Sequence, residues 1–246
     1  MWALMKKRVD VSVILCAYNE GNVIEETIDR VNRVLMETGW SYEIIVVDDG
    51  SLDDTRERAV SYRDRNGKSC LKVLSYQKNV GKGNAVKVGF EQARGDFIVV
   101  MDSDLDVNPI HIPRYVEALK SSDIAVASKW HPKSHTSVSL KRKVLSFGFN
   151  VLSRLFTGIK LKDTQTGLKA FRRSVLDKMI PKLVVERYAY DLELMAACNH
   201  CGFRITSLPV DVHIESNIGL REILRMAFDL FRVAYRLRIL KYYQRS

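Results

Sequence analysis

The stretch FIVVMDSDLD, residues 97–106, joins the pattern of a buried strand to a group of carboxylates. Apolar residues, several of them β-branched, run from Phe97 to Met101, and Asp102, Asp104 and Asp106 follow at every second position. On an extended or tightly turned backbone these side chains point the same way and repel one another unless a cation lies between them. Carboxylate oxygens suit Mg²⁺ or Mn²⁺, and such ions suit a diphosphate. For a single D-x-D, a solvated acidic turn is the alternative.

Three other strand patterns end in polar turns of the same kind. The strand expected over residues 9–15 runs into CAYNE, the strand over 42–47 ends in DDGS, and the strand over 71–75 leads to QKNVGKGNA. Each turn alone could be structural, because Asp, Gly and Ser are ordinary turn residues. The GKG segment is not a P-loop, since the pattern G-x-x-x-x-G-K-[ST] is absent from the sequence. The agreement among the turns favours a binding site.

Helical patterns separate these strands. Ile24, Ile28, Val31 and Leu35 share one face of the first predicted helix, for which Asn22 is the expected N-cap. The next helix is expected to begin near residues 53–54 and a third at residue 84. Alternating strands and helices predict an α/β fold whose parallel sheet has helices on both faces, and such sheets bind ligands beyond the carboxyl ends of their strands. All four turns lie at those ends.

Composition restricts the class of protein. A chain of 246 residues with 46% hydrophobic content is long enough for one large α/β domain with a substantial core. The formal charge of +10 favours anionic partners, which include a nucleotide, a lipid phosphate, an acidic membrane surface or nucleic acid. The four cysteines do not form a disulfide scaffold. Cys198 and Cys201 form one C-x-x-C, which has too few ligands for structural zinc, so we expect them on a packed helix face.

The N-terminus and the apolar runs bear on localisation. MWALMKKRVD has too short an apolar stretch for a signal peptide, and no uninterrupted apolar run is long enough to span a bilayer. We therefore expect a cytoplasmic protein that is soluble or peripheral on the cytoplasmic face of a membrane.

The motifs taken together resemble a known family. AYNE, VVDDGS, NVGKGNA and DSDLD, in that order, resemble family 2 glycosyltransferases of the GT-A fold, and more narrowly the dolichyl- or polyprenyl-phosphate sugar transferases. LKRKVLSFGFNVL, DTQTGLKAFRR and VERYAYDLELM are similar to segments of dolichyl-phosphate glucosyltransferases, and LKRK is also close to dolichyl-phosphate mannose synthases. The resemblance covers nearly the whole chain. It implies a Rossmann-like, mostly parallel central sheet with helices on both faces.

The resemblance also implies roles for individual residues. Asp104 and Asp106 would hold Mg²⁺ or Mn²⁺. Other positions would bind the nucleotide sugar: Ala17, Tyr18, Glu20, Asp48, Asp49, Lys82, Gly83, Asp102, Ser103 and Gln165. Three positions depart from the family pattern, with Ala17 where many members have proline, Asp106 where mannose synthases often have glutamine, and Lys129 in place of an arginine. These departures leave the base and the sugar open.

The chemistry depends on the acceptor. A lipid phosphate is already anionic and needs cations to hold it in line rather than a general base, and the resemblance favours Lys129, Arg142 and Ser146 for that role. A basic, solvated helix face is the alternative reading of this segment. A hydroxyl acceptor would instead require a carboxylate base, and Asp191 is the candidate. The resemblance implies a single inversion at the anomeric carbon.

Two segments have open interpretations. Residues 163–167, DTQTG, either cap the helix expected over 174–179 or, by resemblance, lie at the sugar or acceptor pocket. His213, Glu215 and Asn217 are expected in a loop after a strand over 206–212, in a region that closes over the donor in related enzymes.

The last stretch predicts a basic amphipathic helix. We divide the chain into a GT-A domain over 1–218 and a C-terminal helix over 219–246. The basic stripe and the apolar face suit an anionic membrane surface, and packing of the first half on the core is the alternative. The stripe consists of Arg221, Arg225, Arg232 and Arg236, and the apolar face of Leu220, Ile223, Leu224, Ala227, Phe228, Phe231, Ala234 and Tyr235.

The leading hypothesis is a metal-dependent enzyme that moves a hexose, foremost glucose from UDP-glucose, to dolichyl or polyprenyl phosphate. The alternatives within the fold are mannose from GDP-mannose, an N-acetylhexosamine donor, or a hydroxyl acceptor. A catalytically silent nucleotide-sugar-binding subunit is the alternative of another class, and a membrane protein is a further conceivable partner. We expect no nucleic-acid partner, because it would explain the charge and leave the aspartates unexplained.

Overall fold

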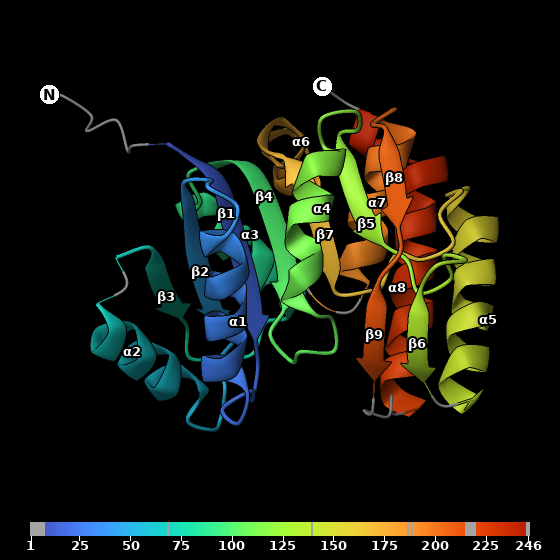
Figure 1. Ribbon diagram of the computed structural model, residues 1–246. Helices are drawn as coiled ribbons and strands as arrows, with labels where there is room; N and C mark the ends of the chain where they lie inside the picture. Colours follow the sequence, from blue (N-terminus) through green and yellow to red (C-terminus); the bar gives the residue numbers. More distant parts are fainter. Residues whose placement is uncertain are drawn as a thin grey trace, which may run out of the picture.

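The computed structural model describes residues 8–67, 69–138, 140–185, 187, 189–214 and 220–244. A seven-stranded sheet lies at the centre, in the order β3-β2-β1-β4-β7-β5-β8 (Figure 1). Its strands are β1 (Val9–Ala17), β2 (Tyr42–Asp48), β3 (Leu71–Ser75), β4 (Gly95–Asp102), β5 (Ile124–Ala127), β7 (Leu168–Arg172) and β8 (Ile205–Leu208). All neighbours pair in parallel except β7, which is antiparallel to both β4 and β5. The predicted mostly parallel α/β sheet is confirmed.

Helices cover both faces of the sheet. One face carries α1 (Ile24–Met36), α2 (Thr55–Asn66) and α4 (Ile112–Ala118), and the other carries α3 (Lys82–Gln92), α6 (Arg173–Met179) and α7 (Tyr190–His200). Strand β1 shows why, because Val13 packs in the core under α1 while Ile14 packs in the core under α3. Alternate side chains of one buried strand thus pack in two hydrophobic cores, one on each face of the sheet.

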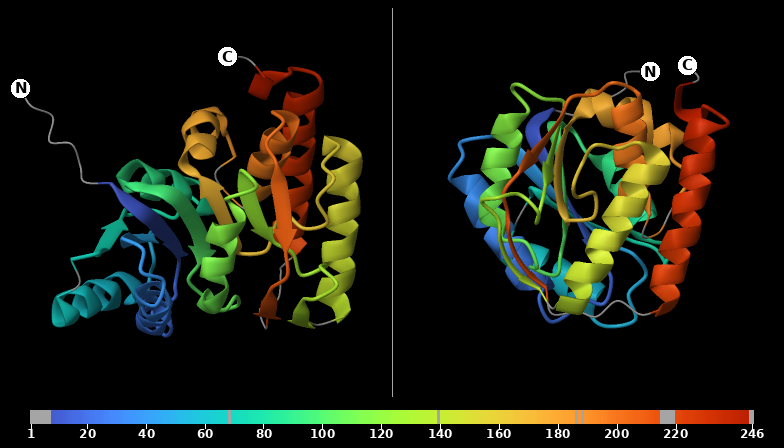
Figure 2. Two further views of the ribbon diagram at one scale, coloured as in Figure 1. Left: turned by 45° about the horizontal axis from the view of Figure 1, so that its top comes forward. Right: turned by 90° about the vertical axis from the view of Figure 1, so that its right-hand side faces the viewer.

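The remaining elements form one flank of the molecule. The long helices α5 (Leu140–Thr157) and α8 (Leu220–Arg238) lie side by side there, beside a small parallel pair, β6 (His135–Val138) and β9 (Asp211–Ile214) (Figure 2). The Phe156 and Phe231 rings meet edge to face with centroids 4.9 Å apart. The described residues also form three short 3₁₀ helices: η1 (Pro109–His111), η2 (Ile180–Lys182) and η3 (Tyr242–Gln244). None of the described helices is long and apolar enough to span a bilayer.

Local expectations differ from the structure at two places. Asn22 is not the N-cap of α1; that position belongs to Val23, and the first amides of the helix donate to the carbonyl oxygen of Glu20. The single strand expected over 206–212 is two strands, β8 and β9, in different sheets. Pro209 lies between them and has no N–H for a ladder, while the N–H of Val210 donates to Ser134 Oγ at 3.0 Å. The chain therefore changes sheets at this proline.

The C-terminal helix packs differently from the sequence expectation. Leu230, Val233 and Leu237 are buried, whereas Phe228 and Phe231 of the expected apolar face are 65% and 54% exposed. The second half of α8 thus packs on the core, and it does so through a face that differs from the expected apolar face. The alternative, packing of the first half on the core, is not seen in residues 225–229, none of which is buried, and the side chains of residues 220–224 lie outside the described part.

The expected packed helix position is confirmed for Cys198 and is wrong for Cys201, which is only partly buried. Cys198 is buried in α7 and Cys201 follows directly after that helix, and both are free thiols.

Candidate active site

The loops after β1 and β2 are joined at the carboxyl edge of the sheet. The amide of Asn19 donates to Ser51 Oγ at 2.9 Å, and Asn19 Oδ1 accepts from the amide of Leu52 at 2.8 Å. The amide of Glu20 donates to Thr55 Oγ1 at 2.8 Å. Asn19 has a φ of +57°, a left-handed conformation that Asn tolerates better than most residues. These contacts fix the AYNE turn, and with it Glu20, against the DDGS turn.

Asp49 organises the loop between β3 and α3. Its carboxylate accepts hydrogen bonds from Tyr76 OH at 2.7 Å, Asn79 Nδ2 at 3.2 Å and the amides of Val80 and Gly81 at 2.9 Å each. The residue is buried. Asp49 therefore shapes the loop that leads to Lys82, and its predicted contact with a nucleoside stays a prediction.

The acidic run forms a crowded cluster of carboxylates with Glu20. Asp104 Oδ1 accepts from the amide of Asp106 at 3.0 Å across a turn in which Leu105 has a φ of +61°. Burial, followed by the charges of Asp102 and Asp106, raises the pKa of Asp104 to about 7. Burial and the same three aspartates raise the pKa of Glu20 to about 7. The cluster carries more negative charge than its surroundings balance.

This surplus fits a divalent cation. Among the described residues, no three carboxylate, imidazole or thiol groups gather closely enough to hold a metal by themselves. Mg²⁺ commonly binds one or two carboxylates and completes its shell with substrate phosphates and water. Asp104 and Asp106 fit that requirement, because a positive charge beside them would offset both the burial and the repulsion that raise the pKa of Asp104.

A buried chain of ion pairs lies next to the cluster. Lys82 Nζ is 2.7 Å from Asp102 Oδ1 and 3.2 Å from Asp191 Oδ2, and Lys169 Nζ is 2.8 Å from Asp191 Oδ1. Burial alone would raise the pKa of the Asp191 carboxyl, but Lys169 and Lys82 outweigh it and hold that pKa below its usual range. Sequence reasoning missed Lys169, although a lysine within the strand pattern LKAFR was a usable signal.

A second buried carboxylate, Asp163, ties the loop before β7 to the loop after β5. Its oxygens accept from Thr166 Oγ1 at 2.7 Å and from the amides of Lys129 and Gln165 at 3.0 Å each. The interpretation of residues 163–167 as a helix cap is wrong, because the loop leads into β7 and the N-cap position of α6 is Arg172. Asp163 itself was missed as a positioning group.

Lys129 and Ser146 lie on neighbouring elements. Lys129 Nζ is 3.9 Å from Asp163 Oδ2 and its side chain is largely buried. The ring of Trp130 meets that of Phe147 edge to face at 6.2 Å, which brings the segment of α5 that carries Ser146 against the Lys129 loop. Arg142 is also in α5, and its side chain lies outside the described part.

The remaining predicted residues line or support the same edge. Ala17 is buried at the end of β1, Tyr18 after it is exposed, and Asp48 Oδ1 accepts from the amide of Ser51 at 3.1 Å. Gly83 lies against α7, since a Cβ added there would be 2.6 Å from Tyr190 Cδ2.

Ser103 lies in the turn directly after β4, and Gln165 lies in the loop before β7. Ser103 Oγ donates to the carbonyl oxygen of Cys16 at 2.8 Å. Gln165 is half-buried and follows Thr164 in the loop held by Asp163.

The predicted loop position of His213 is wrong, because β9 continues through this residue. His213 belongs to β9, and its amide donates to the carbonyl oxygen of Asp106 at 3.0 Å. Glu215 and Asn217 lie outside the described residues.

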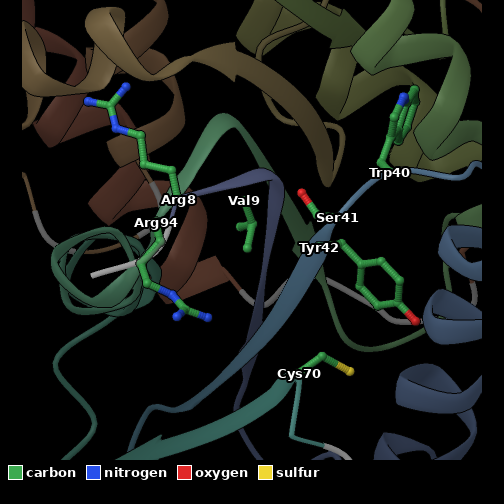
Figure 3. Close-up of a pocket in the computed structure, with 7 residues that line it drawn as sticks. All are labelled: Arg8, Val9, Trp40, Ser41, Tyr42, Cys70 and Arg94. Atoms are coloured by element: carbon green, nitrogen blue, oxygen red, sulfur yellow. The ribbon is translucent and has the colours of Figure 1, made fainter. Parts of the chain in front are cut away.

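The structure has a hollow of about 420 Å³ at the opposite edge of the sheet (Figure 3). It opens at the amino ends of β1 and β4, so it is separate from the acidic cluster at their carboxyl ends. The residues that line it are Arg8, Val9, Trp40, Ser41, Tyr42, Cys70 and Arg94.

The fold and the site define an α/β protein with a carboxylate cluster at the carboxyl ends of its strands, and comparison with known proteins gives the family. Residues 12–180 match the family described as Glycosyl transferase family 2. The chain therefore belongs to glycosyltransferase family 2, as the motifs predicted.

Individual relatives agree with this family. The chain is 34% identical over 244 residues to Glycosyltransferase AglD of Haloferax volcanii. This match covers 94% of this chain and 38% of AglD. It is 29% identical over 244 residues to a dolichyl-phosphate beta-glucosyltransferase of Dictyostelium discoideum, covering 92% of this chain and 74% of that protein. The chain thus spans well under half of AglD and about three quarters of the Dictyostelium protein.

A solved structure confirms the fold. The glucosyl-3-phosphoglycerate synthase of Mycobacterium tuberculosis, in complex with UDP, superposes with a TM-score of 0.70 at 23% sequence identity. The match covers 92% of this chain and 79% of the mycobacterial chain. The GT-A fold implied by the motifs is therefore the fold observed.

Proposed function

We propose that this chain is a metal-dependent inverting glycosyltransferase that moves glucose from UDP-glucose to the phosphate of a dolichyl or polyprenyl lipid. One observation supports the proposal above all. At one edge of the sheet, the carboxylate cluster lies near the loop that carries Lys129, and this loop packs on α5, a helix with exposed apolar side chains. The name of the Dictyostelium relative supports the sugar and the acceptor. The mycobacterial synthase has been crystallised with Mn²⁺ and UDP, which supports the donor and the ion.

The donor side needs charge neutralisation. Asp104 and Asp106 would hold Mg²⁺ or Mn²⁺, which would neutralise the charge that grows on the diphosphate as the glycosidic bond breaks. Lys82, held between Asp102 and Asp191, lies at the start of α3, where it adds a positive charge on the same edge. The turns fixed by Asp49 and Asn19 would position the nucleoside.

The acceptor side needs orientation more than proton transfer. A phosphate oxygen is anionic at neutral pH, so its attack on the anomeric carbon requires alignment and screening of charge. Lys129 and Ser146 supply a cation and a hydroxyl on adjoining elements, and we assign Arg142 to the same role by its place in α5. Attack in line with the departing diphosphate inverts the anomeric centre.

The flank formed by α5 and α8 suits a membrane surface. Both helices begin near the edge that carries the acidic cluster and run along the same side of the molecule (Figure 1). Exposed Arg154, Arg225 and Arg232 accompany the apolar residues, which favours an anionic headgroup layer. The exposed apolar residues are Leu145, Phe147, Val151, Leu152, Leu155, Phe228, Phe231, Tyr235, Ile239, Leu240 and Tyr242.

Contact of α5 and α8 with the membrane would bring the active site to its lipid substrate. A polyprenyl chain stays in the bilayer while its phosphate lies at the headgroup layer. An enzyme that rests α5 and α8 on that layer would bring Lys129 and the acidic cluster to the phosphate. The chain would then act peripherally, on the cytoplasmic face where nucleotide sugars are available.

The test is transfer of labelled sugar in parallel reactions. UDP-glucose, GDP-mannose and UDP-N-acetylglucosamine are each offered with polyprenyl phosphate and with the unphosphorylated polyprenol in the same vesicles. We expect label from UDP-glucose on polyprenyl phosphate and none on polyprenol. Label from another donor would contradict the assigned sugar, and equal labelling of the polyprenol would contradict the phosphate acceptor.

A further inference from the structure

Lys169 is the most deeply buried ammonium at the site. It is the second residue of β7, the strand between β4 and β5, and only 2% of its surface is exposed. Nζ contacts Asp191 Oδ1 at 2.8 Å and donates to the carbonyl oxygen of Thr166 at 2.9 Å. Burial of an ammonium is costly unless a counter-charge and hydrogen bonds accompany it, and Asp191 supplies that counter-charge.

Asp191 is equally enclosed. It is 4% exposed, and its two oxygens face two different ammonium groups, Oδ1 facing Lys169 and Oδ2 facing Lys82. A carboxylate that removes a proton from an acceptor must reach that acceptor with a free oxygen and hold the proton. The two lysines stabilise the ionised form of Asp191, and each of its oxygens already contacts an ammonium group.

An ion pair and a backbone hydrogen bond hold Asp102 from two sides. Lys82 Nζ contacts Asp102 Oδ1 at 2.7 Å, and the amide of Asp102 donates to the carbonyl oxygen of Gly167 at 3.1 Å. Gly167 follows Thr166, whose carbonyl holds Lys169. Lys169 thus has two contacts that lead to Asp102. It pairs with Asp191, which holds Lys82, and it binds the loop whose Gly167 accepts from the amide of Asp102.

We infer that Lys169 and Asp191 are positioning residues, a buried ion pair that fixes Lys82 and Asp102 where the diphosphate of the donor binds, and that Asp191 takes no proton from the acceptor. The inference rests on the proposed function, since it assumes a nucleotide-sugar donor and a phosphate acceptor. It gives Lys169 a role and replaces the general-base role that the sequence left open for Asp191.

Charge removal in a cycle of variants tests this inference. Asp191→Asn leaves Lys169 buried without its counter-charge, Lys169→Met removes that ammonium, and the double variant removes both charges. Each variant is measured for UDP affinity in the presence of Mn²⁺ by calorimetry and for transfer of glucose to polyprenyl phosphate. Because the double variant buries no unpaired charge, it keeps the test decisive if a single variant folds poorly.

For the single variants we expect KM for the donor and Kd for UDP to rise about tenfold, the equivalent of one charge-assisted hydrogen bond, with a smaller fall in kcat. The double variant should lose less than the product of the two single losses, because the two charges act as a unit. Loss of kcat by about 10²-fold or more in Asp191→Asn at unchanged UDP affinity, with no recovery in the double variant, would overturn the inference and make Asp191 a base.

Glu43→Gln provides a matched control. Glu43 is a fully buried carboxylate that also faces two cations, Lys72 at 2.7 Å and Arg94 at 3.0 Å, at the opposite edge of the sheet. This variant should lower stability and leave UDP affinity unchanged. A wild-type protein that neither binds UDP nor transfers glucose would refute the proposed function itself. Active wild type with strictly multiplicative losses would refute only the positioning role.

Discussion

Arg236 Nη1 in α8 lies 3.3 Å from Glu193 Oε1 in α7. The hydroxyl of Tyr243 donates to the same oxygen, and the amides of Val184 and Val185 donate to Glu193 Oε2 at 3.0 and 2.8 Å. One buried carboxylate therefore joins the C-terminal helix to the segment before α7. Val185 also lies against Gly83 at the active site, so the flank and the site share a support.

Replacement of Glu193 should destabilise the whole domain. Glu193→Gln leaves the Arg236 guanidinium, whose side chain is only 15% exposed, without its counter-charge. Loss of one partner of a buried ion pair costs about 3 kcal/mol in the free energy of unfolding, which urea titration measures. Arg232→Gln is the control on the same helix, because its side chain is 54% exposed and its 3.8 Å pair with Asp229 is worth about 1 kcal/mol or less. Equal effects of the two substitutions would contradict the coupling.

Gly167 should tolerate no side chain. A Cβ added there would lie 2.3 Å from Asp102 Oδ2, so Gly167→Ala must displace Asp102 from Lys82. We expect UDP affinity to fall about tenfold, with the loss of roughly one charge-assisted hydrogen bond. Among the described residues, no atom lies within 4 Å of a Cβ added at Gly148 in α5, so Gly148→Ala should stabilise the protein by about 0.5–1 kcal/mol and keep the affinity. An unchanged Kd for UDP in Gly167→Ala would contradict the packing argument.

The strands, and the edge of the sheet at which the acidic cluster lies, could be predicted from the sequence because both depend on local patterns. The apolar run before Asp102 marks a buried strand, and the turn residues after it mark its carboxyl end, so the position of the acidic cluster followed from the sheet rule alone. Four alternating strands and helices repeated the same signal, and the motifs in their turns identified the family.

Residues whose partners are distant in the sequence could not be predicted in the same way. The motifs that contain Lys169, Asp163 and Glu193 do not reveal the contacts of these side chains, because each has a partner in another element of the fold. The amphipathic pattern of α8 likewise does not say which apolar residues pack, because the buried face depends on the neighbouring helix. Phe231 illustrates this, since it meets Phe156 of α5 and stays half exposed.

Polar substitutions on the exposed apolar flank should weaken membrane binding and leave folding intact. Phe147, Leu155 and Phe228 are each more than 60% exposed, so their replacement by Ser removes little buried area. We expect the triple variant to sediment less with anionic vesicles that contain polyprenyl phosphate, because it loses apolar surface that would enter the interface. Met36→Ser, on an exposed apolar residue of α1, is the control. Equal sedimentation of the wild type and the triple variant would place the membrane contact elsewhere.

Glu43 should control part of the acid stability. Burial alone would raise the pKa of Glu43, but hydrogen bonds from Lys72, Ser12 and Arg94 outweigh it and lower that pKa below its ordinary value of 4.5. A lowered folded-state pKa contributes stability that is fully present above the unfolded value and is lost as the pH falls through the folded value. The difference in unfolding free energy between wild type and Glu43→Gln should therefore be largest at neutral pH and shrink below pH 4.5. A difference independent of pH would contradict this assignment.

Metal-dependent transfer of glucose to a lipid phosphate can be tested in a single assay. Label from UDP-glucose is followed onto polyprenyl phosphate for the wild type and Asp104→Ala, with Mn²⁺ and with EDTA. We expect labelling by the wild type with Mn²⁺, and a loss of about 10²-fold or more with EDTA or in the variant, because charge on the departing diphosphate is then left unscreened. Transfer that continues at the wild-type rate in EDTA or in Asp104→Ala would contradict this expectation.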